Sequence, residues 1–125
     1  MADPVVLYEV DDKVSIITLN RPEKLNAISP ELRLQLTDAF TRADADTATS
    51  VVLLRAEGRS FCAGYDISAR EPGSDDWRSD PTKAHDHLHP QLEFEMLPWT
   101  MKKPVIASVQ GHVRAAGVSW SCCAI

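Results

Sequence analysis

Two apolar runs, each ending in a turn rich in small residues, constrain the fold of this 125-residue chain more than any other feature. The run "SVVLLRA" at 50–56 is followed by "EGRSFCAG", and "PVIASVQ" at 104–110 is followed by "GHVRAAG". The first run is nearly unbroken, which is typical of a strand covered on both faces. The two turns are expected at the carboxyl ends of neighbouring strands, where open α/β sheets place their ligands.

The amino-terminal patterns predict a hairpin followed by a helix. "VVLYEV" and "VSIITL" flank a short polar turn, so Val5–Val10 is expected to pair with Val14–Leu19. Ser29, followed by Pro30 and an early acid, has the order of residues that begins a helix. Apolar residues then recur at helical spacing and predict one buried face: Leu32, Leu36, Phe40 and Ala43.

The second half continues the alternation of helices and strands. The polar segment Glu71–Pro81 is expected to form a surface loop or lid, and a helix is expected from Thr82 to Trp99. After the strand at 104–110, the small residues at 115–117 open a further helix. The sequence therefore predicts a single domain of the α/β class.

Composition excludes several classes of protein. The chain has 18 acidic and 13 basic residues, a formal net charge of −5, and no basic block, which argues against a nucleic-acid surface or an anionic membrane patch. The absence of a long apolar run and of a signal-like start predicts a cytoplasmic protein with no membrane partner. The odd number of cysteines fits a reducing compartment, and all three are expected to be small buried side chains: Cys62, Cys122 and Cys123.

Other clusters of reactive or aromatic side chains have ordinary structural explanations. His85 and His89 are four residues apart on the expected helix, but no third ligand is indicated, so a solvated face is favoured and no metal site is predicted. Cys62 has no triad pattern beside it and is interpreted as a buried thiol. The tryptophans do not share one helical period and are interpreted as core and lid anchors: Trp77, Trp99 and Trp120.

Three segments in one order carry a family resemblance. "LNRPEKLNAIS" at 19–29, "GRSFCAGYDIS" at 58–68 and "KKPVIASVQGHVRAAG" at 102–117 resemble the enoyl-CoA hydratase/isomerase family, also called the crotonase superfamily. The resemblance implies a crotonase-like spiral of strand-strand-helix units. Residues 1–125 would be the amino-terminal part of one such domain, ending before its carboxyl-terminal helical region. A sheet without that region would leave an apolar face and an edge uncovered.

The resemblance also implies an activity on acyl-CoA thioesters, as in the lyases and isomerases of fatty acid metabolism. Coenzyme A would be part of the substrate, so no separate cofactor is implied. Family members form homo-oligomers, trimers or dimers of trimers. The alternative left open is a truncated, noncatalytic fragment that binds acyl-CoA or takes part in assembly.

Specific residues follow from the resemblance. The backbone N–H groups of Tyr65 and Ala116 would stabilise the oxyanion of a thioester enolate. Lys24 has the alternative of a solvated loop residue, and Asp66 the alternative of a cap on the next turn. The positions expected along the coenzyme A moiety and the acyl thioester are Arg21, Lys24, Leu25, Ala27, Ala63, Gly64, Asp66 and Ile67.

Two departures from the family pattern bear on the reaction. Ser119 stands where hydratases of the family place the first of two catalytic glutamates, and a serine hydroxyl cannot replace that carboxylate as a general base. Hydration is therefore doubtful on residue grounds, while isomerisation or another enolate reaction stays open. In "RAAG", alanine stands in a turn that is often glycine-rich, which would cause strain if the backbone there has a positive φ.

Overall fold

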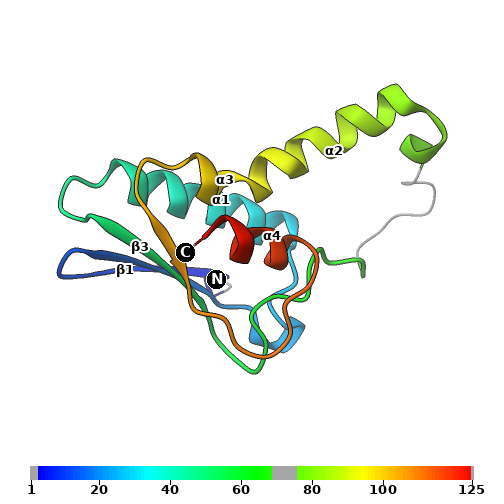
Figure 1. Ribbon diagram of the computed structural model, residues 1–125. Helices are drawn as coiled ribbons and strands as arrows, with labels where there is room; N and C mark the ends of the chain where they lie inside the picture. Colours follow the sequence, from blue (N-terminus) through cyan, green and yellow to red (C-terminus); the bar gives the residue numbers. More distant parts are fainter. Residues whose placement is uncertain (1–2, 69–75, 125) are drawn as a thin grey trace.

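The computed structural model describes residues 3–68 and 76–124, which form a four-stranded sheet with helices on one side (Figure 1). The strands are β1 (Val6–Asp11), β2 (Val14–Leu19), β3 (Val51–Ala56) and β4 (Val105–Ala107), in the order β1-β2-β3-β4. β1 and β2 pair antiparallel, and β2, β3 and β4 are parallel. The expected hairpin and the α/β class are confirmed.

Helix α1 (Pro30–Ala45) begins as its sequence predicts and supplies one face of the core. Ser29 caps it by accepting a hydrogen bond from the Leu32 N–H at 3.1 Å. Its other end is tied down by Lys103, whose ammonium group donates to the carbonyls of Ala43 and Asp46, where a cation also favours the helix dipole. The predicted apolar face is buried against the sheet: Leu32, Leu36, Phe40 and Ala43 against Ile17, Leu19, Val52 and Leu54.

The expected helix at 82–99 is two helices. α2 (Pro81–Glu95) and α3 (Leu97–Thr100) are separated at Met96. Pro98 has no N–H to donate to the carbonyl four residues before it, and its ring would clash with that carbonyl in a continuous helix. The short 3₁₀ helices η1 (Pro22–Lys24) and η2 (Asp76–Ser79) precede α1 and α2. Residues 71–75 of the expected loop lie outside the described residues. Figure 1 shows α2 extending past the end of the sheet.

The expectation that the 50–56 strand is covered on both faces is wrong for the described residues. Val52 and Leu54 are fully buried under the helices, whereas Leu53 and Arg55 on the opposite face are half-buried. On that face Arg55 pairs with Glu9 at 2.7 Å and donates to Thr18 at 3.1 Å. A polar network, rather than a second helical layer, therefore covers part of this side.

Helix α4 (Ala116–Cys123) lies beside α2 and α3 on the helical side of the sheet. The expected 104–110 strand is shorter than predicted, and its last residues belong to the turn that leads into α4. Trp120 of α4 is fully buried and meets the Phe94 ring edge to face, with centroids 5.4 Å apart. This contact holds the last turn of α2 against α4.

Candidate active site

The three sequence segments quoted above meet at the carboxyl ends of β3 and β4, joined by backbone hydrogen bonds. The segment at 61–62 pairs with the β4 turn, because the Phe61 N–H donates to the Gln110 carbonyl at 2.8 Å and the Arg114 N–H donates to the Cys62 carbonyl at 3.0 Å. The next residues pair with the loop before α1, where the Ala63 N–H donates to the Leu25 carbonyl at 3.0 Å. The segment after β3 therefore lies between the other two.

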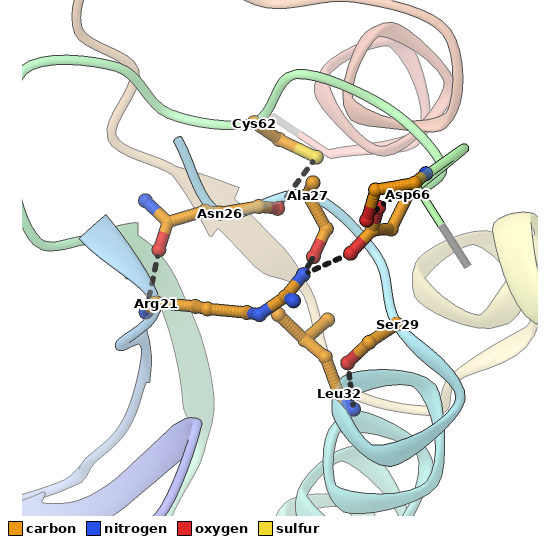
Figure 2. Close-up of polar contacts among 8 residues, drawn as sticks. Arg21, Asn26, Ala27, Ser29, Leu32, Cys62 and Asp66 are labelled. Atoms are coloured by element: carbon orange, nitrogen blue, oxygen red, sulfur yellow. Dashed lines mark hydrogen bonds and ion pairs between the residues drawn. The ribbon is translucent and has the colours of Figure 1, made fainter. Parts of the chain in front are cut away.

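Asn26 and Arg21 organise the loop before α1 (Figure 2). The fully buried Asn26 side chain accepts a hydrogen bond from the Arg21 N–H at 2.8 Å and donates to two carbonyls, those of Glu57 and Ser60. The Arg21 guanidinium lies between the Ala27 carbonyl and an Asp66 carboxylate oxygen, at 2.9 Å from each. Sequence reasoning missed Asn26, although a lone amide inside an otherwise turn-forming loop is the signal that could have found it.

The Asp66 carboxylate joins the segment after β3 to the loop before α1. Its carboxylate accepts hydrogen bonds from the Ser68 hydroxyl at 2.6 Å and the Ser68 N–H at 2.9 Å, in addition to the ion pair with Arg21. The hydrogen bonds from Ser68, and then that from Arg21, lower the pKa of Asp66 to about 2. The alternative interpretation of Asp66 as a cap on the next turn is thereby confirmed.

The turn after β3 and the turn after β4 are in contact at Gly64 and Gly117, where no side chain would fit. A Cβ added to Gly64 would lie 3.0 Å from the Ala115 Cβ, and one added to Gly117 would lie 2.9 Å from the Cys62 Cβ. Gly64 also has a φ of 93°, which side chains rarely permit. The glycines therefore allow one turn to pack directly against the backbone of the other.

Ala115 has the strained backbone that the sequence raised as a possibility. Its φ is 48° and its ψ is −120°, although it carries a methyl group. The residue directly precedes α4 and makes no side-chain cap. Alanine therefore stands at a position whose conformation favours glycine.

Several backbone N–H groups on these turns make no hydrogen bond with the described residues, and those of Tyr65 and Ala116 are among them. Around Tyr65, the neighbouring groups pair with Ile28: the Ile28 N–H donates to the Gly64 carbonyl at 2.8 Å and the Asp66 N–H to the Ile28 carbonyl at 3.0 Å. In such a parallel bridge the Tyr65 N–H points away from Ile28. Ala116 is the first residue of α4, where a helix leaves N–H groups without internal partners.

An apolar-rich cavity of about 540 Å³ adjoins Tyr65 and lies between α1 and α2. Its size is in the range of small-molecule sites. The Tyr65 side chain donates to Glu95 at the end of α2, at 3.0 Å. Burial, and next the negative charge of Glu95, raise the pKa of the Tyr65 hydroxyl well above its usual range. Residues lining the cavity include Ile28, Arg33, Leu34, Tyr65, Asp66 and Trp77.

A family model described as enoyl-CoA hydratase/isomerase matches residues 9–124 of this chain. The chain belongs to the enoyl-CoA hydratase/isomerase family. The three quoted segments all lie within the matched residues. The predicted membership of the crotonase superfamily, in its amino-terminal region, is confirmed.

Named relatives of this enoyl-CoA hydratase/isomerase family member agree with the assignment. A probable enoyl-CoA hydratase of Mycobacterium tuberculosis is 35% identical over 117 residues, which cover 94% of this chain and 43% of the relative. The 1,2-epoxyphenylacetyl-CoA isomerase of Escherichia coli is 33% identical over 119 residues, covering 91% of this chain and 43% of the relative. The chain thus spans less than half the length of these relatives.

A solved structure of the same family confirms the fold. The crystal structure of a probable enoyl-CoA hydratase from Mycobacterium thermoresistibile superposes with a TM-score of 0.81 at 34% identity. The superposition covers 98% of this chain and 48% of the other. The predicted crotonase-like fold is therefore shown for the region that this chain represents.

The structure brings most of the expected site residues of this family member together. Arg21, Ala27 and Asp66 meet in one cluster, and Leu25 and Ala63 share a backbone hydrogen bond. Lys24 is exposed on η1, and Ile67 has 70% of its surface exposed. The roles of these residues toward a ligand stay predictions.

The expectations for cysteines and tryptophans are confirmed in part. Cys62 is fully buried, which raises the pKa of its thiol, whereas Cys122 is exposed because it lies on the outer side of α4. Trp120 is a core residue, but Trp99 is 68% exposed on α3 and does not anchor the core.

The histidine-rich stretch of α2 is exposed, as expected. Within residues 3–68 and 76–124, no group of three His, Cys, Asp or Glu side chains is arranged to hold a metal ion. In the same part of the chain, no helix is long and apolar enough to cross a membrane.

Proposed function

We propose that this chain contributes an acyl-CoA site in which the Tyr65 and Ala116 N–H groups hold the thioester oxygen and stabilise the enolate oxyanion formed in the reaction. The observation that carries the proposal is the pair of turns whose N–H groups lack partners among the described residues. The turns are in contact at Gly64 and Ala115. Fixed donors aimed at a developing oxyanion contribute about 3–4 kcal/mol each to transition-state stabilisation.

Two features support this use of the N–H groups. The Ala116 N–H lies at the amino end of α4, where the partial positive charge of the helix favours an oxyanion. Tyr65 lines the 540 Å³ cavity, which has room for an acyl group. All functional groups in the proposal belong to the chain and the substrate, and coenzyme A enters as part of that substrate. The relatives reported above are named as enzymes, which favours an enzyme over the noncatalytic alternative.

A donor deletion at Ala116 tests the proposal. Proline at this position removes the N–H, and the first helical position accepts proline, as α1 and α2 both begin with it. Ala116→Gly is the control, because it also changes the residue at this position but keeps the N–H. Calorimetric titration with crotonyl-CoA should show binding by the parent, and Ala116→Pro should bind about 3- to 10-fold more weakly than Ala116→Gly.

The carbonyl of the bound thioester provides a second readout. Hydrogen bonds from the two N–H groups should shift the infrared band of a ¹³C-labelled thioester carbonyl to lower wavenumber. Ala116→Pro should reduce the shift and Ala116→Gly should keep it. Absence of binding by the folded parent, or identical shifts in the two variants, would refute the proposal; circular dichroism establishes that each protein is folded.

A further inference from the structure

Glu95 connects the two turns of the site through its carboxylate. It is the last residue of α2 and is far in sequence from both turns. One oxygen, Oε1, accepts a hydrogen bond from the Tyr65 hydroxyl at 3.0 Å, and the other, Oε2, accepts one from the Ser119 hydroxyl at 2.8 Å. Both carboxylate oxygens are therefore positioned by side chains of the site.

The two donors link Glu95 to the elements that carry the candidate oxyanion groups. Tyr65 itself carries one of the unpaired N–H groups, and Ser119 lies one helical turn after Ala116, which carries the other. The edge-to-face contact between Phe94 and Trp120 holds the end of α2 against α4. The carboxylate is thus fixed from three directions rather than carried on a free surface side chain.

The other carboxylate near the turns is poorly suited to take a proton. Asp66 is ion-paired with Arg21 and accepts two hydrogen bonds from Ser68, and these contacts lower its pKa. A carboxylate stabilised in this way is a weak base. Glu95 makes no ion pair with the described residues, so its charge is not already neutralised by a cation.

We propose that Glu95 is the catalytic base and acid of this site. The inference rests on the function proposed above. Ser119 has no carboxylate of its own. Its hydroxyl donates to the Glu95 carboxylate at 2.8 Å, so a carboxylate from α2 lies next to this position. One carboxylate is enough for a double-bond shift, in which the proton that is removed is also returned.

The proton and electrons balance without any co-reactant. The Glu95 carboxylate takes a proton from the carbon next to the thioester carbonyl, and the C–H electron pair forms a new C=C bond as the carbonyl pair moves onto oxygen. The N–H groups of Tyr65 and Ala116 hold that oxyanion. The protonated Glu95 then returns its proton to the far end of the extended enolate, the thioester carbonyl re-forms, and the double bond has moved into conjugation.

Exchange of the α proton isolates this step from the rest of the reaction. The full chain is incubated with butyryl-CoA in D₂O, and deuterium at the carbon next to the carbonyl is measured by mass spectrometry. Glu95→Gln keeps the size of the side chain and its ability to hydrogen-bond with both hydroxyls, but it cannot accept a proton. We expect exchange about 10²- to 10⁴-fold slower than in the parent, with binding of butyryl-CoA retained in calorimetry.

The matched control is Glu93→Gln on the same helix. The Glu93 side chain is 69% exposed and pairs with His89, away from the turns, so exchange should be unchanged. A merely structural role of Glu95 is separated by rescue: adding Ser119→Glu to Glu95→Gln should restore exchange at least 10-fold.

The outcomes separate the two proposals. If the folded parent does not bind butyryl-CoA, the function proposed above fails and this inference fails with it. If the parent binds but does not exchange, or if Glu95→Gln exchanges as fast as the parent, the role of Glu95 is overturned while acyl-CoA binding stands. If Glu95→Gln does not fold by circular dichroism, the double variant with Ser119→Glu decides the question.

Discussion

Replacing Ala115 with glycine should stabilise the protein, although the substitution removes a methyl group. Ala115 has a φ of 48° and a ψ of −120°, and a left-handed backbone costs an L residue about 1–2 kcal/mol. The Ala115 side chain is exposed, so its removal uncovers little apolar surface. Glycine loses about 0.5–1 kcal/mol more conformational entropy on folding than alanine. The difference is a net gain of about 0.5–1 kcal/mol in the free energy of unfolding.

Thermal and urea denaturation, followed by circular dichroism, measure this gain. For a domain of this size, the gain corresponds to a rise of roughly 2–5 °C in Tm. Ala84→Gly is the matched control, because Ala84 lies inside α2 with an ordinary helical backbone and should lose about 0.5–1 kcal/mol. If Ala115→Gly destabilises the protein as much as Ala84→Gly does, the strain argument is refuted.

Two further predictions concern the loop before α1. Asn26→Leu should lower the free energy of unfolding by about 2–4 kcal/mol in urea denaturation, because it leaves the Arg21 N–H and two carbonyls without partners. The control is Asn20→Leu, which removes an exposed amide and should lower the free energy of unfolding by less than about 1 kcal/mol. Because the pKa of Asp66 falls from 3.8 to about 2 on folding, its stabilising contribution is complete above about pH 4 and is lost as the pH falls through about 2. The difference in unfolding free energy between the parent and Asp66→Asn should shrink over that range, and an equal difference at pH 6 and pH 2 would contradict the prediction.

Most of the fold could be predicted from local signals in the sequence. The cap at Ser29, Pro30 and the apolar spacing from Leu32 determine α1 through interactions within one or two turns. The β1–β2 hairpin is equally local, because its polar two-residue turn joins adjacent strands. The sequence-based error at 82–99 had a local cause as well, since Pro98 already carried the information that a helix ends near Met96.

The parts of the site that sequence reasoning missed depend on contacts between distant segments. Asn26 reaches the backbone of residues 57 and 60, and Glu95 reaches side chains 30 positions before it and 24 after it. No periodicity or cap identifies such partners, because each requires the packing of α2 on α4 or of one loop on another. The one-sided burial of β3 has the same origin, since it depends on which elements lie on each face of the sheet.

The small residues of the two turns have different roles, and together they explain why the unpaired N–H groups exist. Gly64 allows the positive φ of its own turn and the approach of Ala115, whereas Gly117 has no positive φ and is required by the nearness of Cys62 and Val113. When the turns pack this closely, many of their carbonyls and N–H groups pair with the flanking segments, and the N–H groups of Tyr65 and Ala116 make no hydrogen bond with the described residues. Strain at Ala115 is the cost of holding α4 in that position. A side chain added at Gly117 should therefore separate the turns and weaken thioester binding in calorimetric titration, although it removes neither N–H group.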